Sequence, residues 1–485
     1  MIAILVWPAT SFVALLVGAQ VLHLLGLRLA NRASHTGDGA SQGDSALHAA
    51  VALMLGYTIV GLGALVLGLL GYANWWALAE LLLGLAFVGV LSLNQCIATL
   101  ITLTRTAWRG LRSSPYAPAY RVVTIIVIAQ ALAALAPAGP TDYDGISQHL
   151  VHGQQYLMAG KITPLWYDHH SHFPATVQML YMLAQSFGEP DAAKLFHWGF
   201  AVLALLVTLV AGRRLLGPGA GAYGALILAT TPSFAWLMGV AYVDLATTAG
   251  GILALTLLCL WLRDQNTTHL WMSALMIGAT ATTKMQALAL LGVLAVAVVI
   301  GASGGGLRRI KLAAAYAGIA LALCLPWYAK TWVWTGNPVY PFAYSVFDGK
   351  MWSADRAEAY TRSQLEFGKG ELPPGQELAA MSPLRRTFTG PRAPANLLLA
   401  PLRLLTEPVE FTVGPSVFGA FAFASPGPLY LALIPLLLLL KPPRPVGWII
   451  LVFAPLGLWW LMSMQLARYL LPSLALLAPA AGWAA

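Results

Sequence analysis

The chain has 485 residues, of which 59% are hydrophobic and only 9% are charged, whereas an ordinary soluble domain has about 25% charged residues. This composition excludes a soluble globular protein and indicates an integral membrane protein. The net charge of +9 comes from short basic clusters between apolar runs, and these clusters show no aromatic pattern typical of RNA or DNA binding, so no nucleic-acid partner is indicated. Cys96, Cys259 and Cys324 lie in apolar segments without paired spacing, which argues against a disulfide framework or a zinc knuckle.

Apolar runs long enough to cross a bilayer recur along the whole chain. A window of roughly 20 apolar residues predicts about thirteen spanning helices, the first of them a retained helix and not a signal peptide. The runs are broken by glycine and proline and lack the strict alternation of an outer-membrane barrel, so we predict an all-α polytopic membrane protein. The predicted spans are 2–27, 47–72, 76–104, 121–139, 192–212, 220–241, 245–263, 269–283, 286–303, 312–329, 427–440, 446–463 and 469–485.

Basic residues collect in alternate loops between these spans. By the positive-inside rule those loops face the cytoplasm, the amino terminus lies outside and the carboxy terminus lies inside. The other loops then hold nearly all of the acidic residues, so we expect any chemistry carried by ionisable side chains on the outer face. The basic clusters are Arg28 and Arg32; Arg105, Arg109, Arg112 and Arg121; Arg213 and Arg214; Arg263; Arg308, Arg309 and Lys311; and Lys441 and Arg444.

Two of the outer loops are long, whereas the other connections are simple turns. Long loops in a compact protein are usually functional or disordered, and aromatic residues such as Trp332 and Trp352 argue against disorder in the second. We expect surface-lying helices in both loops and treat the chain as one integral membrane unit. Its predicted parts are the N-terminal helices 1–140, the first outer loop 141–191 as the candidate catalytic region, the central helices 192–329, the second outer loop 330–426 and the C-terminal helices 427–485.

The stretch TDYDGISQHL opens the first outer loop at Thr141. From Tyr143 onward it predicts an amphipathic surface helix. Thr141 or Asp142 can cap this helix, and Asp144 can favour its dipole. Alternatively, a carboxylate that faces a cavity at the membrane boundary has a raised pKa and can act as a general base; we favour Asp144 and keep Asp142 as the second candidate. The polar side of the predicted helix comprises Asp144, Gln148, His152 and Gln155.

Six of the ten histidines fall in or near this loop. Within YDHHSHFPATVQMLY, Asp168, His169 and His170 offer ligands for a divalent metal ion, although their spacing matches no standard zinc signature. Histidines near lipid headgroups also serve as plain hydrogen-bond donors, and both interpretations stay open. The histidines are His149, His152, His169, His170, His172 and His197, and the candidate substrate-binding residues are His149, His152, Tyr156, His172 and Asp244.

Ionisable groups at the outer ends of apolar helices form a second set of candidates, because such groups are costly at bilayer depth. Lys284 interrupts GATATTKMQAL, where it can also snorkel to the interface. Arg468 and Tyr469 together can offer a guanidinium clamp and a phenol to a lipid phosphate. Asp244, in VAYVDLATT, can instead be the ion-pair partner of Arg468. Lys330 in the second loop adds positive charge that favours an anionic ligand or simply a solvated loop face.

The motifs, taken in order, resemble a known family. YDGISQHL, YLMAGKITPLW and HFPATVQMLYMLA are followed by VAYVDLATT, GATATTKMQAL, WVWTGNPVYPF and ARYLLPSL. This order resembles the bacterial membrane glycosyltransferases of the GT-C superfamily, relatives of the protein O-mannosyltransferases and of the aminoarabinose transferase of lipid A. The resemblance extends from about Thr141 to the carboxy terminus.

The resemblance implies transfer of a sugar from a polyprenyl-phosphate carrier to an acceptor on the outer side of the bacterial cytoplasmic membrane. It implies that the acid of the first loop is the base, which matches Asp144, with Asp142 second. Lys284, Arg468 and Tyr469 then match the donor-phosphate group of the family, and we add Lys330 to this group.

The chain departs from the family pattern in two ways. It has Asp-Tyr-Asp where many members have adjacent acids, which leaves the choice of base open. It also lacks the soluble outer domain of many members, so we assign acceptor binding to the loop 330–426.

Our functional hypothesis is an inverting glycosyltransferase that uses a lipid-linked sugar and a lipid, glycan or protein acceptor. A transporter or flippase of a lipid-linked sugar is the first alternative, but it would place charged residues at the bilayer midplane. A noncatalytic scaffold and an O-antigen ligase or polymerase are the others; the last would depend on outer-loop arginines and histidines in place of the aspartates.

Overall fold

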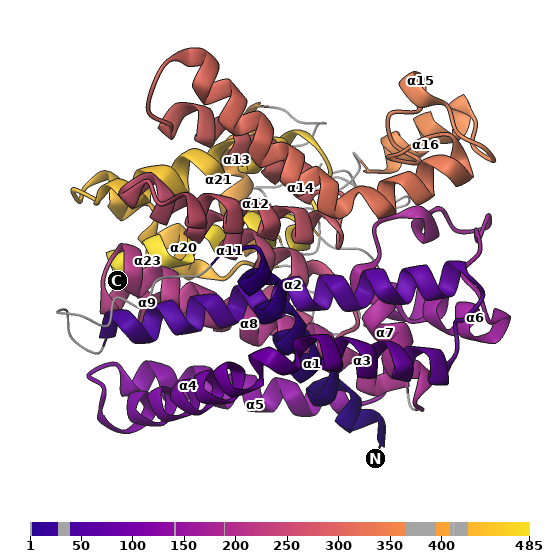
Figure 1. Ribbon diagram of the computed structural model, residues 1–485. Coiled ribbons are helices and arrows are strands. Elements are labelled where there is room, and N and C mark those ends of the chain that lie inside the picture. Colours follow the sequence, from indigo (N-terminus) through magenta and orange to yellow (C-terminus); the bar gives the residue numbers. More distant parts are fainter. Residues whose placement is uncertain are drawn as a thin grey trace.

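The part of the chain that the structure describes consists of helices, without a β-strand (Figure 1). Eight of its helical segments are long and apolar enough to cross a membrane. The prediction of an all-α, multi-pass membrane protein is therefore confirmed, but the count of about thirteen full spans is not. The computed structural model describes residues 2–27, 39–139, 142–188, 190–364, 394–407, 411 and 425–485. The eight segments are Ile4–Leu24, Ser45–Leu69, Trp75–Ser113, Ala117–Leu135, Asp191–Leu215, Asp244–Asp264, Gly306–Thr335 and Arg444–Met462.

The N-terminal helices follow the predicted spans closely, with one extension. They are α1 (Ile2–Leu24), α2 (Gly39–Leu69), α3 (Trp75–Gly89), the 3-10 turn η1 (Val90–Ser92), α4 (Leu93–Ser113) and α5 (Ala117–Leu135). The sequence predicted the third span to end at 104, but α4 continues to Ser113 as an amphipathic helix beside α5 (Figure 1). Large apolar side chains such as Phe87, Leu91 and Leu132 are exposed on this group, as expected for helices that face lipid.

The central helices surround one buried helix, α11. The central helices, including α11 itself, are α8 (Lys194–Leu215), α9 (Pro218–Ala229), α10 (Pro232–Leu237), α11 (Asp244–Asp264), α12 (Thr267–Ala281), α13 (Ala287–Gly301) and α14 (Gly306–Thr335). Nearly every residue of α11 is buried, because α8, α12 and the C-terminal helix α22 (Ala467–Leu476) pack around it. The polar residues at its first turn are therefore held inside the bundle.

Proline residues divide three predicted spans into shorter pieces. The predicted span 220–241 is α9 and α10, separated at Pro232. The span 427–440 is α20 (Pro428–Leu433) and the 3-10 helix η7 (Pro435–Leu438), and 469–485 is α22 and α23 (Ala478–Ala484). Proline lacks the amide hydrogen that the helix interior needs, so it begins a new segment at each break. The remaining C-terminal helix is α21 (Arg444–Met462).

Elements of both predicted outer loops lie at the same end of the molecule. Figure 1 places α6 and α7 at the right-hand side, with α15 and α16 above them beside the end of α14. The elements of the first loop are the π-helix η2 (Gly145–His149), α6 (Val151–Ala159), η3 (His169–His172), α7 (Thr176–Ser186) and η4 (Pro190–Ala193). Those of the second loop are α15 (Tyr344–Phe347), α16 (Ala354–Gln364) and α18 (Pro394–Thr406).

Helices α1 and α2 approach each other at backbone contact distance. A Cβ atom added at Gly18 would lie 1.9 Å from the carbonyl oxygen of Ala52, and one added at Gly56 would lie 1.8 Å from that of Ala14. Small residues of this kind let membrane helices pack closely. The contact bears on the outer loop because α2 also packs against α7, with Gly61 against Thr176.

We predict that Gly56→Ala destabilises the protein. The added methyl group overlaps the α1 backbone, and such overpacking costs about 1–3 kcal/mol, which exceeds the roughly 1 kcal/mol that alanine gains over glycine in a helix. The thermal unfolding midpoint in detergent should fall by several degrees. Gly84→Ala in α3 is the matched control, since no atom lies within 4 Å of its added Cβ. An equal fall in both variants would contradict the packing argument.

Candidate active site

The first outer loop begins with a π-helical turn in place of a regular α-helix. The Leu150 amide donates to the Gly145 carbonyl oxygen at 3.0 Å, five residues back. A π-helical turn holds more residues than an α-helical turn, so it changes which side chains share a face. The predicted continuous polar stripe is therefore wrong: Asp144 and Gln148 line a large cavity, whereas His152 points to Asp168.

Asp142 fastens this loop to the segment before α11. Its Oδ2 accepts the Ala241 amide at 3.1 Å, and a Cβ added at Gly145 would lie 2.0 Å from its Oδ1. The side chain lines a smaller cavity of about 490 Å³ together with Lys194. Burial raises the pKa of Asp142, although the Ala241 amide and Lys194 oppose that shift. The other predicted cap, Thr141, lies outside the described residues.

The large cavity, called the main cavity below, has a volume of about 950 Å³. Its wall combines segments that are far apart in the sequence: the π-helical turn, the first turn of α11, the α12–α13 connection and the start of α22. The side chains that carry the argument are Asp144, His149, Asp244, Lys284, Arg468 and Tyr469. All six were candidates from the sequence, and the fold brings them together.

Two ion pairs cross the wall of the main cavity. Arg468 Nη1 pairs with Asp144 Oδ2, and Lys284 Nζ pairs with Asp244 Oδ1 at 2.7 Å. The sequence had suggested Asp244 as a partner of Arg468; the structure gives each cation a different aspartate. The Tyr469 ring lies beneath both cations, 4.1 Å from Lys284 Nζ and 5.2 Å from Arg468 Cζ. Pairing offsets the large desolvation penalty that each charge meets inside the helix bundle.

The two ion-pair aspartates have different surroundings. Burial by itself would raise the pKa of Asp144, but the charge and hydrogen bond of the Arg468 guanidinium outweigh it and the net shift is downward. Asp144 is therefore an ionised carboxylate at neutral pH. Asp244 lies at the first position of α11, where the helix dipole favours a negative charge, and its Oδ2 has no partner among the described residues.

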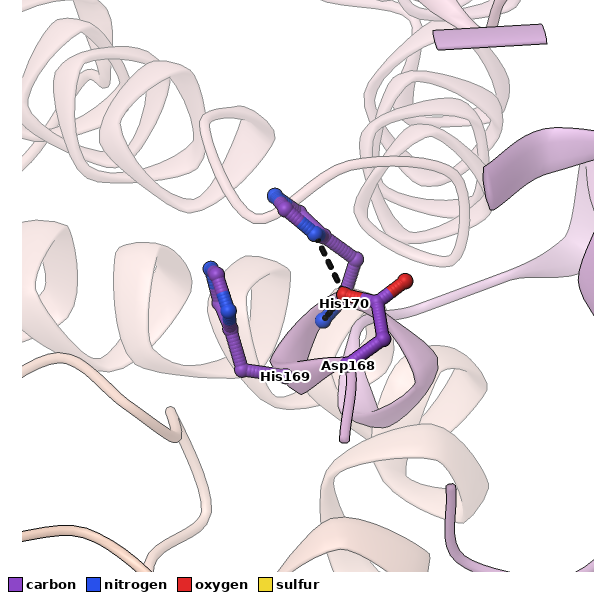
Figure 2. Close-up of side chains that lie close together, drawn as sticks. All are labelled: Asp168, His169 and His170. Atoms are coloured by element: carbon purple, nitrogen blue, oxygen red, sulfur yellow. Dashed lines mark hydrogen bonds and ion pairs between the residues drawn. The ribbon is translucent and has the colours of Figure 1, made fainter. Parts of the chain in front are cut away.

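The histidine cluster of the first loop is organised around Asp168 (Figure 2). Asp168 Oδ1 accepts from His170 Nδ1 at 2.6 Å, and Oδ2 accepts from His152 Nε2 at 2.7 Å. The rings of His169 and His170 are tilted by 34° to each other, have centroids 4.0 Å apart and point the same way (Figure 2). Asp168 thus ties α6 to η3, and Asp168 and His170 also line the main cavity.

The same cluster is the candidate metal site of the described part of the chain. One ligand atom from each of Asp168, His169 and His170 can be chosen so that all three lie within 4.8 Å of one another. His169 Nε2 is buried and has no hydrogen-bond partner among the described residues, which fits a role as a metal ligand. The Nδ1 atom of His170 is hydrogen-bonded to Asp168 Oδ1, and His152 would hold the second carboxylate oxygen from outside.

Three further candidates are buried and do not line the main cavity. Lys330 Nζ donates to the Ser171 carbonyl oxygen at 3.2 Å and lies over the rings of Trp327 and Trp334, so it is separate from Lys284 and Arg468. His172 is buried against the Trp166 and Tyr340 rings. Tyr156 is buried beside the His152 ring.

Sequence reasoning missed two residues of the main cavity region. Tyr242 contacts the Arg468 guanidinium at 4.9 Å, and its hydroxyl accepts the Asp144 amide at 3.3 Å. Gln178 on α7 contacts His149. The sequence did contain a signal that could have identified each residue. Tyr242 precedes the candidate Asp244 by two residues, and Gln178 is a lone amide in the apolar run TVQMLYML.

Comparison with known proteins gives two distant structural neighbours. No family model and no curated protein matches the chain. The crystal structure of ArnT from Cupriavidus metallidurans bound to undecaprenyl phosphate has a TM-score of 0.48 and 16% identity, and the match covers 76% of this chain and 59% of that one. The apo state has a TM-score of 0.46 and 17% identity over 74% and 59%. Both neighbours are GT-C enzymes.

ArnT is the lipid A aminoarabinose transferase, one of the enzymes that the sequence motifs resemble. The present chain spans 59% of the length of each ArnT structure. Donor, acceptor and activity are therefore proposals for this chain, and they are derived below from its own side chains.

We predict that removing one member of an ion pair is more harmful than removing both. Asp244→Asn leaves the Lys284 ammonium without its carboxylate and should lower stability by about 3 kcal/mol. The double variant Asp244→Asn/Lys284→Met carries neither charge and should recover most of that loss in thermal unfolding. A double variant less stable than Asp244→Asn would show that the pair is not the source of the effect.

We also predict that stability falls as the pH drops below about 6.5. Burial lowers the pKa of His149 to about 3 and the pKa values of His169 and His172 to about 4. The unfolded chain takes up protons near the ordinary histidine pKa of about 6.5, while these folded histidines stay neutral. Protons therefore favour the unfolded state between about pH 6.5 and 4, and stability is lost as the pH falls through that window.

His172→Gln tests the contribution of one histidine. The slope of unfolding free energy against pH should become shallower by up to about 1.4 kcal/mol per pH unit. Trp166→Phe alters the same pocket without removing a titrating group, so its slope should match that of the wild type. Equal slopes in wild type and His172→Gln would refute the assignment.

Proposed function

We propose that the protein transfers a sugar from a polyprenyl-phosphate donor to an acceptor hydroxyl, with inversion at the anomeric carbon and Asp144 as the general base. The observation that carries this proposal is the main cavity, where the Asp144 and Asp244 carboxylates lie beside two cations and a phenol. The Asp144 carboxylate suits proton removal, and the cations suit a departing phosphate. The sequence resemblance to GT-C enzymes supplies the donor class.

The reaction follows from these groups. The acceptor oxygen bonds to the anomeric carbon as the bond from that carbon to the phosphate oxygen breaks. The acceptor proton passes to the Asp144 carboxylate, and the phosphate leaves as a polyprenyl phosphate with one more negative charge. Arg468 and Lys284 lie where they can stabilise this developing charge, and Tyr469 lies between them.

Because of the ion pairs, binding of the donor phosphate would also change the basicity of Asp144. A donor phosphate would compete with Asp144 for Arg468 and with Asp244 for Lys284. Once Arg468 turns to the phosphate, Asp144 loses the contact that holds its pKa down, and burial then makes it a stronger base. The base would thus be strengthened only when the donor is present.

The apolar part of the cavity wall offers a place for the start of the lipid chain. Met285, Ala289 and Trp459 line the cavity beside the charged groups. Ala289 lies on α13 and Trp459 on α21, and both helices also carry exposed apolar side chains such as Val296 and Leu458. A polyprenyl tail could leave the cavity between these helices and enter the bilayer. We place the cavity on the outer side of the cytoplasmic membrane because the basic residues collect in the loops on the other side.

We predict that Asp144→Asn lowers transfer by about 100-fold or more, the usual effect of losing a general base. The protein would be reconstituted in vesicles that contain extracted polyprenyl-phosphate sugars and acceptor, and sugar transfer and released polyprenyl phosphate would be measured by mass spectrometry. Polyprenyl phosphate binding should persist in this variant. Asp264→Asn, at the opposite end of α11, is the matched control and should keep full activity.

Three results would overturn parts of this proposal. Full activity in Asp144→Asn together with its loss in Asp142→Asn would identify the other aspartate as the base. Movement of the lipid-linked sugar across the vesicle membrane without any product would favour a flippase. A requirement for His149 or His172 but for neither aspartate would favour a ligase- or polymerase-type transferase.

A further inference from the structure

We propose that Gln178 fixes His149 as a neutral hydrogen-bond donor to an uncharged oxygen of the donor sugar. This inference rests on the proposed transferase function and assigns two side chains to sugar recognition. His149 would contact the sugar, whereas Gln178 would act through His149 as a positioning residue.

The tautomer of His149 follows from its one side-chain hydrogen bond. Gln178 Nε2 lies 3.1 Å from His149 Nδ1, and an amide nitrogen can only donate. Nδ1 must therefore accept, which leaves the ring proton on Nε2 if the ring is neutral. Burial keeps the ring neutral at ordinary pH, since it lowers the pKa of His149 to about 3.

The donor atom of His149 is open to the main cavity. Both His149 and Gln178 line that cavity. His149 Nε2 makes no hydrogen bond with any of the described residues. It is nevertheless not fully buried, in contrast to the buried, unpartnered polar atoms of the described chain. The Tyr242 ring packs against the imidazole in a T-shaped contact, with ring centroids 5.8 Å apart. The ring can thus present its N–H in one fixed direction.

Gln178 is well placed to impose this orientation. It lies one turn into α7, a helix whose residues from Thr176 to Gln185 are all buried. The helix start is anchored from two sides: the Thr176 amide donates to the Thr282 carbonyl oxygen at 3.1 Å, and Trp327 Nε1 donates to Thr176 Oγ1 at 3.0 Å. The backbone that carries Gln178 is therefore fixed, and the side-chain amide of Gln178 is held by its hydrogen bond to His149.

The chemistry of the cavity assigns this donor to the sugar and not to the phosphate. Arg468 and Lys284 are charged donors that bind a phosphate more strongly than a neutral imidazole can. Asp144 and Asp244 supply acceptors for sugar hydroxyl groups, but they cannot donate to a sugar oxygen while ionised. His149 adds a neutral donor to this wall, so it should discriminate between sugars that carry an accepting oxygen at that position and sugars that lack it.

Substitutions at His149 separate a donor role from a merely structural one. The side-chain amide of His149→Gln can place an N–H near the position of Nε2, whereas that of His149→Asn reaches only as far as Nδ1. His149→Gln should keep kcat/KM within a few-fold of wild type, and His149→Asn should lose about tenfold, as expected for one neutral hydrogen bond. Equal activity of the two variants would overturn the proposal.

Gln178→Glu tests the positioning role directly. A carboxylate beside Nδ1 can only accept, so the ring proton should move to Nδ1 and Nε2 should become an acceptor. In protein labelled with 15N-histidine, the Nε2 resonance of His149, assigned by its loss in His149→Gln, should change from protonated to unprotonated type, and kcat/KM should fall about tenfold. Gln185→Glu makes the same chemical change farther along α7, where the amide contacts the Leu150 carbonyl. It should leave the His149 resonances unchanged.

The two proposals fail in different ways. If wild-type protein forms no glycosylated product, the transferase function fails. If it is active but His149 carries its proton on Nδ1 in the wild type, or Gln178→Glu leaves the tautomer unchanged, the transferase function stands and the assignment of Gln178 and His149 is wrong.

Discussion

Burying charge at the boundary of an apolar helix bundle is the constraint on which the site depends. An isolated ionised side chain there carries a penalty of several kcal/mol. Four charged side chains of the main cavity offset this penalty by pairing with an opposite charge. Arg468 pairs with Asp144, and Lys284 pairs with Asp244. Since these residues come from four separate segments, the pairs also hold the outer loop, α11, α22 and the α12–α13 connection together.

The π-helical turn of the first loop shows how local geometry sorts two similar aspartates. Asp142 precedes the turn and accepts the Ala241 amide, next to a smaller cavity. Asp144, only two residues later, lines the main cavity and pairs with Arg468. One carboxylate thus anchors the loop while the other faces the cations. This division of roles is the structural reason for preferring Asp144 as the proposed base.

The fold supports the site through closely packed helices. Glycine contacts bring α1 against α2, α2 packs against α7, and α7 carries Gln178 to His149. Helix α11 is buried along its length and presents Asp244 at its first turn. A cavity built on such elements holds its polar groups in fixed directions, which favours electrostatic stabilisation of a developing charge.

The sequence by itself determined the all-α membrane architecture, because long apolar runs can satisfy their backbone in a bilayer only as helices. It also determined the candidate residues of the main cavity, since Asp144, His149, Asp244, Lys284 and Arg468 stand out as ionisable side chains beside apolar segments. It could not determine the partners of these residues. Pairing depends on contacts between segments far apart in the chain, and only the tertiary structure decided that Asp244 meets Lys284, that Lys330 lies elsewhere among tryptophan rings, and that Gln178 contacts His149.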